Sequence, residues 1–436
     1  MDKLKNKIDL YSKKLWYPYR VKKKQLDINS WSNATIGYNS KKQNTENYQF
    51  NIQKLVKPKY YCKQIILLPT KRQKEILLNW MDIYSKMYNE TLKVIKKEFY
   101  EHKKINLDFK NIRSNYMLKK KEYLHSISGI PTEKNNTKIN KHILDCAIKD
   151  VCSSYKSAFK NLKNSNIKHF RIRYIKQSKH QKFLKIEKLL FSKDRKTFCK
   201  SILGNSIQTT NNINFIEVEH DCNLLYNSIN QQFTLFVPIN VKDNKIEKHN
   251  KRDTIGLDPG IRTFMTGYSK NNILEIGNNL TSKVSKQLKN IDSINKKKIK
   301  NVRIVENKKY TKINNLIDDL HWKTINYLTN NYDTILIGNM STKKIVSKTN
   351  NLYKMTKRIA LIMKLNKFTT RLKYKCSIKN CNFGIVNEMY TSKTCSYCGN
   401  INNNLGSSKI YHCDYCKNKI GRDINGARNI FLLGLK

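Results

Sequence analysis

Apolar residues recur at steps of three and four in two stretches of the first half of the chain. One stretch is HILDCAIKDVCSSYKSAFKNLK, residues 142–163, and the other follows Thr70, a suitable helix N-cap. The apolar positions after Thr70 are Ile76, Leu77, Trp80, Ile83, Tyr84, Met87, Tyr88 and Leu92. This period is typical of an amphipathic α-helix. We therefore predict two helices whose apolar faces pack into a core.

Short alternating runs, typical of β-strands, lie on both sides of these helices. KYYCKQIILLP, residues 59–69, reads as one strand closed by its proline. Between residues 168 and 245 the runs HFRIRYI, NFIEVE and QFTLFVPINV are separated by Asn, Ser and Asp clusters. This pattern predicts a small β-barrel or sandwich. Because one strand precedes the helices and the others follow them, we expect a helical domain inserted into a β domain.

From about residue 251 the pattern alternates between strands and longer helices. DTIGLDPGIRTFMTGYS holds a short apolar strand ending at Asp258, a Pro-Gly turn, and a second apolar run from about Thr263 that can pair back as a hairpin. Helical patterns follow at about 280–305 and 309–330, and YDTILIGNM, residues 332–340, is a buried type of strand. Strands that alternate with helices predict an α/β core.

The charge of the chain narrows the choice of partner. Its 436 residues can form two or three domains, and 86 Lys and Arg against 32 Asp and Glu give a formal net charge of +54. Nucleic acid is the most available polyanion that neutralises such a charge. We find no apolar run that could span a membrane and no secretory signal, so we expect an intracellular protein without a membrane partner. Residues 1–56, polar and basic, predict an arm that is mobile or ordered by RNA.

The cysteines indicate a metal site. Two Cys-x2-Cys pairs separated by fourteen residues form a tetrathiolate zinc pattern, with no open coordination position, made of Cys395, Cys398, Cys413 and Cys416. We therefore predict one structural zinc ion, the alternative being four unrelated buried cysteines. Cys376 and Cys381 form a looser pair that we interpret as packed thiols.

Three acidic residues stand out in the same half of the chain. Asp258 ends a strand, Glu388 precedes the first cysteine pair, and Asp423 follows the second. Clustered carboxylates are the ligands that Mg²⁺ takes, and two ions roughly 4 Å apart would serve phosphodiester hydrolysis. Each acid also has a simpler interpretation: Asp258 shapes the Pro-Gly turn, Asp423 caps a helix that starts at Ile424, and Glu388 is a solvated surface acid.

Three motifs resemble a known family. GLDPGIRTF, YTSKTCSYCG and CDYCKNKIGRDINGARNI are similar to the most recognisable stretches of the TnpB proteins, encoded by IS605- and IS607-type transposable elements, and of their eukaryotic and viral relatives, the Fanzor proteins. The resemblance extends more weakly over most of residues 57–436. Residues 1–56 lie outside it.

The resemblance implies an α+β multidomain fold. It comprises a wedge-type β-barrel with an inserted helical recognition lobe, then a RuvC-like α/β nuclease domain of the RNase H class with an inserted zinc ribbon that binds target nucleic acid. The implied order is a basic arm (1–56), the first strand of the wedge barrel (57–70), the recognition lobe (71–165), the rest of the barrel (166–250), the first part of the nuclease (251–392), the zinc ribbon (393–419) and the last part of the nuclease (420–436).

The resemblance also implies an activity. Family members use a guide RNA from the transposon end and cleave matching double-stranded DNA beside a short adjacent motif. A metal-dependent endodeoxyribonuclease working as a monomeric ribonucleoprotein is therefore expected. Its location would be the nucleus or viral factory in a eukaryotic or viral setting, and the cytoplasm or nucleoid in a prokaryotic one.

One departure from the family pattern concerns the second RuvC motif. Most TnpB proteins end this strand in glutamate, whereas TILIGNM has Gly338 there, followed by the neutral Asn339. Fanzor-like members resemble this chain in carrying the acid before the zinc knuckle, at the position of Glu388. The resemblance thus implies that Asp258, Glu388 and Asp423 are catalytic Mg²⁺ ligands. The alternatives are that Asp333 is the third acid or that the nuclease is inactive.

Two other function classes remain open at the level of sequence. One is a catalytically inactive RNA-guided or plain DNA-binding protein, which metal-dependent cleavage of matched DNA would exclude. The other is a transposase that performs strand transfer, which joining of transposon ends would reveal.

Overall fold

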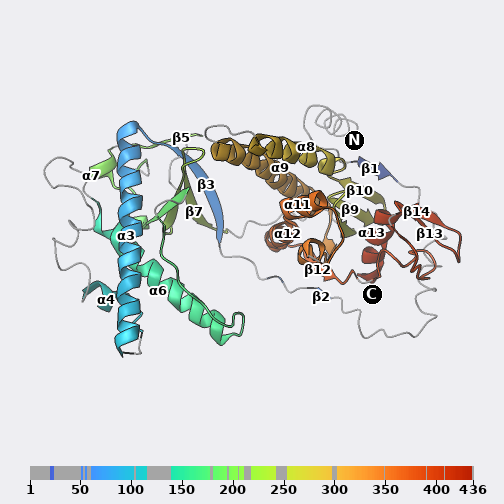
Figure 1. Ribbon diagram of the computed structural model, residues 1–436, viewed down its shortest axis with the longest axis horizontal. Helices are drawn as coiled ribbons and strands as arrows, with labels where there is room; N and C mark the ends of the chain where they lie inside the picture. Colours follow the sequence, from blue (N-terminus) through green and yellow to red (C-terminus); the bar gives the residue numbers. More distant parts are fainter. Residues whose placement is uncertain are drawn as a thin grey trace. The chain divides into compact units, whose positions relative to one another are not determined.

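The chain folds into two compact units, seen in a computed structural model (Figure 1). One unit is formed by residues 59–242, and the other by residues after 242 together with those before 59. The structure describes residues 20–23, 51–52, 55, 60–102, 105–114, 139–176, 180–193, 196–204, 206–210, 218–241, 253–296, 302–347, 349–388, 390–406 and 408–434. Both units combine helices and strands, so the fold is mixed α/β, as expected.

The unit formed by residues 59–242 contains an antiparallel sheet with strand order β4-β6-β7-β3-β5. Its strands are β3 (Tyr60–Leu68), β4 (Gln181–Ile186), β5 (Gln208–Thr209), β6 (Cys222–Asn227) and β7 (Gln232–Asn240). The strands expected at 59–69 and in QFTLFVPINV are confirmed as β3 and β7, which pair along most of their length. Among the described residues this sheet is open, with β4 and β5 at its edges, so closure into a wedge-type barrel stays a prediction.

Two long helices form the other layer of this unit. They are α3 (Lys71–His102) and α6 (Lys141–Lys163), accompanied by the short α4 (Phe109–Ile112), η3 (Lys188–Leu190) and α7 (Lys200–Leu203). Thr70 caps α3 as predicted: its Oγ1 accepts from Gln73 N at 3.3 Å, and Gln73 Oε1 accepts from Thr70 N at 3.0 Å, a reciprocal capping box. The predicted apolar positions of α3 are all buried, which confirms the helical period.

The run HFRIRYI, residues 169–175, is not a strand, contrary to the prediction. Its residues are described without regular structure, and Phe170, Ile172 and Ile175 pack against the core. The backbone of Ile175 bonds a side chain instead of a neighbouring strand, since its N–H donates to Asn89 Oδ1 at 2.7 Å and its carbonyl accepts from Asn89 Nδ2 at 2.9 Å. Most of NFIEVE lies outside the described residues.

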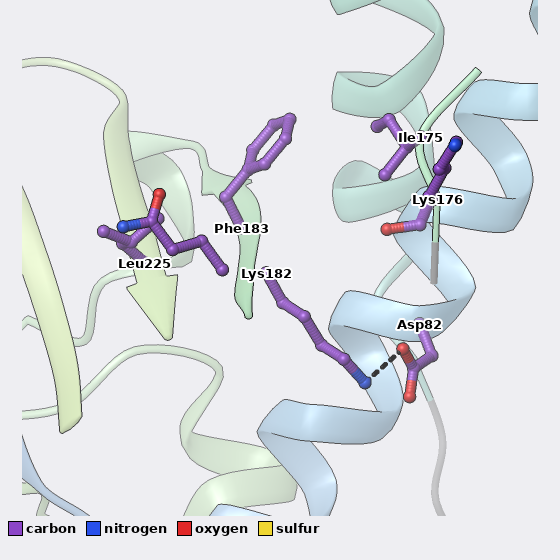
Figure 2. A pocket seen from close by; sticks show the side chains of 8 residues that line it. Asp82, Ile175, Lys176, Lys182, Phe183 and Leu225 are labelled. Atoms are coloured by element: carbon purple, nitrogen blue, oxygen red, sulfur yellow. Dashed lines mark hydrogen bonds and ion pairs between the residues drawn. The ribbon is translucent and has the colours of Figure 1, made fainter. Parts of the chain in front are cut away.

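A small cavity of about 150 Å³ lies between α3 and β4 (Figure 2). Lys182 on β4 reaches across it to Asp82 on α3, with a Nζ–Oδ1 distance of 2.6 Å. Phe183 points away from that ion pair, and Leu225 comes from the neighbouring strand β6. The ion pair ties the long helix to the edge strand of the sheet.

The other unit is built on a seven-stranded mixed sheet with order β1-β10-β9-β8-β11-β12-β2. Its strands are β1 (Arg20–Lys23), β2 (Asn51–Ile52), β8 (Thr254–Pro259), β9 (Met265–Ser269), β10 (Asn272–Ile276), β11 (Thr334–Gly338) and β12 (Asn382–Val386). The predicted hairpin is confirmed, because β8 and β9 pair antiparallel. β8, β11 and β12 run parallel to one another. In the N-terminal arm the structure describes β1 and β2, which pair with β10 and β12; the rest of the predicted arm lies outside the described residues apart from Leu55.

Helices cover both faces of this sheet. They are α8 (Leu280–Lys296), α9 (Val302–Asn331), α10 (Thr342–Val346), α11 (Lys354–Met363), α12 (Leu365–Lys379) and α13 (Arg422–Leu433). Ile335 and Ile337 of β11 pack into the core that contains α8, α9 and α12, whereas Leu336 packs with α13 on the opposite face. This arrangement explains the continuous apolar run of β11, because a strand covered on both faces has no solvated side.

The helix α13 lies unusually close to β8. A Cβ at Gly256 would lie 2.7 Å from the carbonyl oxygen of Ala427 and 2.8 Å from Cα of Phe431. The glycine thus lets the backbone of α13 approach the strand that ends in Asp258.

The boundary between α8 and α9 differs from the prediction. α9 begins at Val302, not near residue 309. Its first turns contact α8 through a polar pair, since Asn295 Nδ2 donates to Glu306 Oε1 at 3.2 Å. The apolar Ile304 and Val305 of these turns are exposed, so they form no buried stripe that continues the pattern of the rest of the helix. Within the part of the chain that the structure describes, no helix is long and apolar enough to cross a membrane.

Candidate active site and metal centre

The sheet register brings the ends of three strands into one row. Leu257 of β8 stands beside Ile337 of β11, and Gly338 stands beside Val386 of β12. Because parallel strands present their carboxyl ends at one edge of a sheet, Asp258, at the end of β8, lies at the same edge as the end of β11. Glu388 follows β12 by two residues and lies at this edge too.

The side chain of Glu388 occupies the space above Gly338. A Cβ at residue 338 would lie 2.7 Å from Cγ and 2.9 Å from Cδ of Glu388, and would also collide with Oε1. The glycine on β11 and the glutamate after β12 are therefore complementary: a larger residue at 338 would displace the carboxylate. The backbone of Glu388 is fixed by Thr391, whose N–H and hydroxyl donate to the Glu388 carbonyl at 3.1 and 3.0 Å.

Asp423 lies in the first turn of α13 and is exposed. The helix begins at Arg422 with Gly421 as N-cap and without a side-chain capping bond, so the interpretation of Asp423 as the cap of a helix starting at Ile424 is wrong. A Cβ at Gly426 would lie 3.1 Å from Cγ of Asp258. Because residues three apart share a helix face, Asp423 stands on the side of α13 that faces Asp258.

Electrostatics link the three acids. Burial raises the pKa of Asp258 well above its usual range, and the negative charges of Glu388 and Asp423 raise it further, while Arg422 lowers it. Burial raises the pKa of Glu388 to about 7. Glu388 Oε1 is buried and receives no hydrogen bond from the described residues. Glu388 is thus not a solvated surface acid, and this set of hard oxygen atoms fits a divalent cation such as Mg²⁺.

The alternative third acid lies elsewhere. Asp333 precedes β11, and its backbone pairs with Asp253 and Asn382 at the amino ends of the neighbouring strands. The length of β11 places Asp333 roughly 16 Å from Gly338, at the opposite edge of the sheet. Asp333 therefore cannot join Asp258 at one metal site.

The four predicted zinc ligands lie together. Across the described residues, Cys395, Cys398, Cys413 and Cys416 are the only set of three or more Cys, His, Asp or Glu whose ligand atoms all fall within 4.8 Å of one another. The Sγ–Sγ distances are 3.6 Å for Cys395–Cys416 and 3.5 Å for Cys398–Cys413, near the ~3.8 Å that a tetrahedral site with Zn–S bonds of about 2.3 Å requires. The cluster could hold one zinc ion. The three carboxylates are more widely spaced, as suits a pair of ions rather than one.

The two cysteine pairs are built alike. In the first, Gly399 N donates to Cys395 O and Cys395 N to Asn400 O; in the second, Lys417 N donates to Cys413 O and Cys413 N to Asn418 O. Gly399 and Lys417 have φ of 76° and 57°, the left-handed conformation that closes each knuckle. β13 (Ile410–His412) and β14 (Lys419–Gly421) form a two-stranded ribbon around the second knuckle.

A buried polar face of α13 holds the segment between Glu388 and the first knuckle. Asn425 Nδ2 donates to the carbonyl of Thr394 at 2.7 Å, and its Oδ1 accepts from Ser396 N at 2.9 Å. Asn429 Nδ2 donates to the carbonyls of Thr391 and Thr394 at 2.7 and 2.8 Å. The sequence analysis did not single out this pair. Two asparagines four residues apart within an apolar helix are nevertheless a signal, because asparagine is a poor helix former and its presence there calls for a specific role.

Arg428 belongs to the same face. Its guanidinium is buried and lies 4.0 Å from the ring centroid of Tyr397 in the first knuckle and 5.8 Å from that of Tyr268 in β9. The residue thus packs between the cysteine module and the sheet.

The looser pair, Cys376 and Cys381, is buried in the core that contains α9 and α12. Cys381 Sγ lies 3.5 Å from the Thr329 carbonyl, as expected of a packed thiol.

Comparisons with known proteins identify the family. Residues 366–430 match the Cas12f1-like, TNB domain family. The chain is 32% identical over 394 residues to TnpB-like proteins L79 and L770 of Acanthamoeba polyphaga mimivirus, covering 86% of this chain and 73% of each relative. It is 27% identical over 398 residues to putative transposase A625R of Paramecium bursaria Chlorella virus 1, with 85% and 86% covered. The chain therefore belongs to the TnpB family.

Solved structures resemble the chain only distantly. A Cas12f1–sgRNA–target DNA complex aligns over 85% of this chain and 99% of that chain, with 16% identity and a TM-score of 0.32. The RNA-guided endonuclease CRISPR-Cas_phi3 aligns over 95% and 98%, with 9% identity and a TM-score of 0.39. Both TM-scores are below 0.5, so neither likeness bears on the site.

Proposed function

We propose that this protein is an RNA-guided, Mg²⁺-dependent DNA endonuclease of the RuvC type, with Asp258, Glu388 and Asp423 as its metal ligands. Membership of the TnpB family supports this class of activity. The observation that carries the proposal is the placement of Glu388: its carboxylate fills the space above Gly338, at the sheet edge where Asp258 lies, and its buried Oε1 receives no hydrogen bond from the residues that the structure describes.

The three acids have separable roles. Asp258 and Glu388 come from the ends of the two strands that flank β11 and are partly buried, so they provide a fixed base for the ions. Asp423 is exposed at the first turn of α13 and completes the site from the solvent side. Bound Mg²⁺ would activate a water molecule and stabilise the leaving oxygen of a phosphodiester.

The cysteine module has a structural role in this proposal. A zinc ion held by four thiolates has no open position, so it supplies stability and not catalysis. Residues 393–419 lie between Glu388 and Asp423 in the chain, so a folded module holds the segments that carry these two acids in position. The module also presents a surface for target nucleic acid.

The partners in this proposal are a guide RNA from the transposon end and double-stranded DNA. The net charge of +54 favours a polyanion held permanently. Base pairing with the guide would select the sequence, and the protein would read backbones and a short adjacent motif. A monomeric ribonucleoprotein satisfies these requirements.

The test is cleavage of DNA matched to the RNA that copurifies with the protein. The RNA is sequenced, a matching duplex is prepared, and cleavage is measured with Mg²⁺ and with EDTA. We expect Mg²⁺-dependent cleavage that falls by orders of magnitude in Glu388→Gln, because the amide removes the charge that offsets the ions, while RNA and DNA binding persist.

The matched control is Asp333→Asn, which removes an acid at the opposite end of β11 and should leave cleavage intact. Full cleavage by Glu388→Gln would reject the assignment of the third acid. Binding of matched DNA without cleavage at any metal concentration would show an inactive RNA-guided binding protein.

A further inference from the structure

The connection between β11 and α11 forms a second polar surface near the acids. Ser341 follows Gly338 by three residues, which limits their Cα separation to about 11 Å. Met340 packs against the core, and Asn339 N donates to the Val386 carbonyl at 3.0 Å. The connection is thus anchored at the sheet edge where Asp258 and Glu388 lie.

A hollow of about 730 Å³ opens in this connection. Its lining residues all carry polar or cationic side chains: Ser341, Lys343, Lys344, Ser347, Thr349, Asn350 and Asn351. Residues 339–364 contain no Asp or Glu, in a stretch of the sequence with six lysines and one arginine. The chemistry of the hollow therefore suits a phosphate backbone and repels no anion.

Hydrogen bonds within the connection hold its shape. Lys357 of α11 donates from Nζ to the carbonyls of Ser347 and Asn350 at 2.8 and 2.6 Å. The Ser341 hydroxyl accepts from Lys344 N at 3.4 Å and caps α10. The surface is formed before any ligand arrives, which lowers the entropic cost of binding.

Three side chains on or near this surface are exposed and open to a ligand. Lys343 and Lys344 are exposed, and neither forms an ion pair with any carboxylate in the described part of the chain. Tyr353, two residues beyond the hollow at the N-cap of α11, is 86% exposed. An exposed aromatic ring, two residues along the chain from a hollow that is lined by two lysines, supplies the groups that bind single strands, in which the ring stacks on a base and the cations contact phosphates.

We propose that this hollow and Tyr353 form a binding surface for single-stranded DNA, which leads the strand to be cut toward the acids. Its identity as the scissile strand rests on the proposed function, whereas the binding itself does not. A single strand is favoured over a duplex because stacking on Tyr353 requires an unstacked base face.

The experiment measures binding of a fluorescent 20-nucleotide oligothymidylate to the purified ribonucleoprotein, in EDTA and over a range of salt. Tyr353→Ala should weaken binding between about 5- and 150-fold, and Tyr353→Phe, which keeps the ring, should bind as the wild type does. Lys343→Ala/Lys344→Ala should weaken binding and reduce the slope of log K against log salt by roughly 1.4, since each phosphate contact contributes about 0.7.

The matched control is Lys308→Ala/Lys309→Ala on α9, which removes the same charge from another part of the same unit and should leave the affinity near that of the wild type. Equal affinity of Tyr353→Ala and the wild type, or an equal loss in the control pair, would overturn the proposal. Loss of the copurifying RNA from the lysine variant would also overturn it, by identifying the surface as a guide RNA site.

Failure here is distinct from failure of the proposed function. Glu388→Gln should bind the oligothymidylate at least as tightly as the wild type, because the substitution removes a negative charge that repels phosphate in the absence of metal. A protein that binds the oligothymidylate but never cleaves matched DNA would support the proposed binding surface and contradict the proposed nuclease activity.

Discussion

At the scale of the residue, the site depends on a pairing between a glycine and a glutamate. Gly338 and Glu388 are far apart in the chain, yet the carboxylate fills the volume that a side chain at 338 would take. Neighbouring parallel strands end at the same edge, so an acid can be supplied by either β11 or the segment after β12. We expect metal binding to require one carboxylate in the space above Gly338, whether it comes from β11 or from the segment after β12.

This pairing predicts the outcome of exchanging the two residues. Gly338→Ala should lower cleavage at least tenfold, because its methyl group displaces the Glu388 carboxylate. Gly338→Glu should abolish cleavage alone but restore part of it in Glu388→Ala, where the space is free. Cleavage rates of the three variants with matched DNA test this prediction.

Glu388→Gln is the wrong background for that exchange, because the amide has the size of the acid and leaves no room for a second side chain. A Gly338→Ala protein that cleaves at the wild-type rate would show that the overlap is easily relieved, and would contradict the steric interpretation.

A second residue-scale prediction concerns His321. Its ring is buried between Phe264 and Phe368, with Nε2 3.0 Å from the Met363 carbonyl and Nδ1 3.2 Å from Arg371 Nη1. Burial lowers the pKa of His321 to about 4. Since the unfolded chain binds this proton near pH 6.5, stability is full above that pH and is lost as pH falls toward 4, by about 3 kcal/mol in total.

Calorimetric melting temperatures between pH 7.5 and 4.5 check this expectation. His321→Gln retains a donor for the Met363 carbonyl but does not titrate, so its melting temperature should depend less on pH than that of the wild type. Identical pH dependence in the two proteins would contradict the assignment.

At the scale of the element, the two cysteine knuckles differ at one position. Gly399 closes the first knuckle and Lys417 closes the second, both with positive φ. A residue with a Cβ is strained in this conformation by about 1 kcal/mol, so Lys417→Gly should stabilise the module, or leave it unchanged where chain entropy offsets the gain. Gly399→Ala should destabilise it and speed loss of zinc to a chelator, which a colorimetric zinc assay measures.

The order of zinc release should therefore be Gly399→Ala fastest and Lys417→Gly no faster than the wild type. Faster release from Lys417→Gly than from Gly399→Ala would show that the two knuckles are not equivalent.

The polar face of α13 gives another prediction at this scale. Asn429→Ala removes the donor that binds the buried Thr391 carbonyl, at a cost of about 1–3 kcal/mol for an unsatisfied group, whereas the Thr394 carbonyl keeps its bond from Asn425 Nδ2. The melting temperature should fall, and cleavage should fall with it, because Thr391 fixes the backbone of Glu388. Added Mg²⁺ should recover part of the cleavage, as expected when a ligand is misplaced but still present.

Asn403→Ala is the control, since it changes an exposed asparagine within the cysteine module. A lower melting temperature with unchanged cleavage in Asn429→Ala would show that α13 stabilises the module without positioning Glu388.

At the scale of the whole molecule, charge dominates. A net charge of +54 opposes compaction unless a polyanion neutralises it. We expect protein stripped of RNA to aggregate or to melt at a lower temperature, and non-specific DNA binding to fall steeply with salt. Light scattering and melting curves before and after ribonuclease treatment check this prediction. A monodisperse RNA-free protein that cleaves matched DNA at full rate would contradict it.

Local patterns predicted the elements well. The capping box at Thr70, the apolar stripe of α3 and the hairpin of β8 and β9 depend on residues close in the chain, where side-chain period and turn chemistry act directly. The cysteine cluster was predictable for the same reason, because each knuckle is a local structure. HFRIRYI is not a strand, and at its last residue, Ile175, the backbone bonds Asn89, which is remote in sequence, instead of a neighbouring strand.

The sequence by itself determined which side chains are available: four thiolates in two knuckles, the acids and a cationic surface. Only the tertiary structure decided which of them meet. The register of β8, β11 and β12 puts Asp258 beside Gly338 and leaves Asp333 at the far edge, and the close approach of α13 brings Asp423 toward Asp258. Strand register and helix packing are contacts between distant segments, which no local period or spacing encodes.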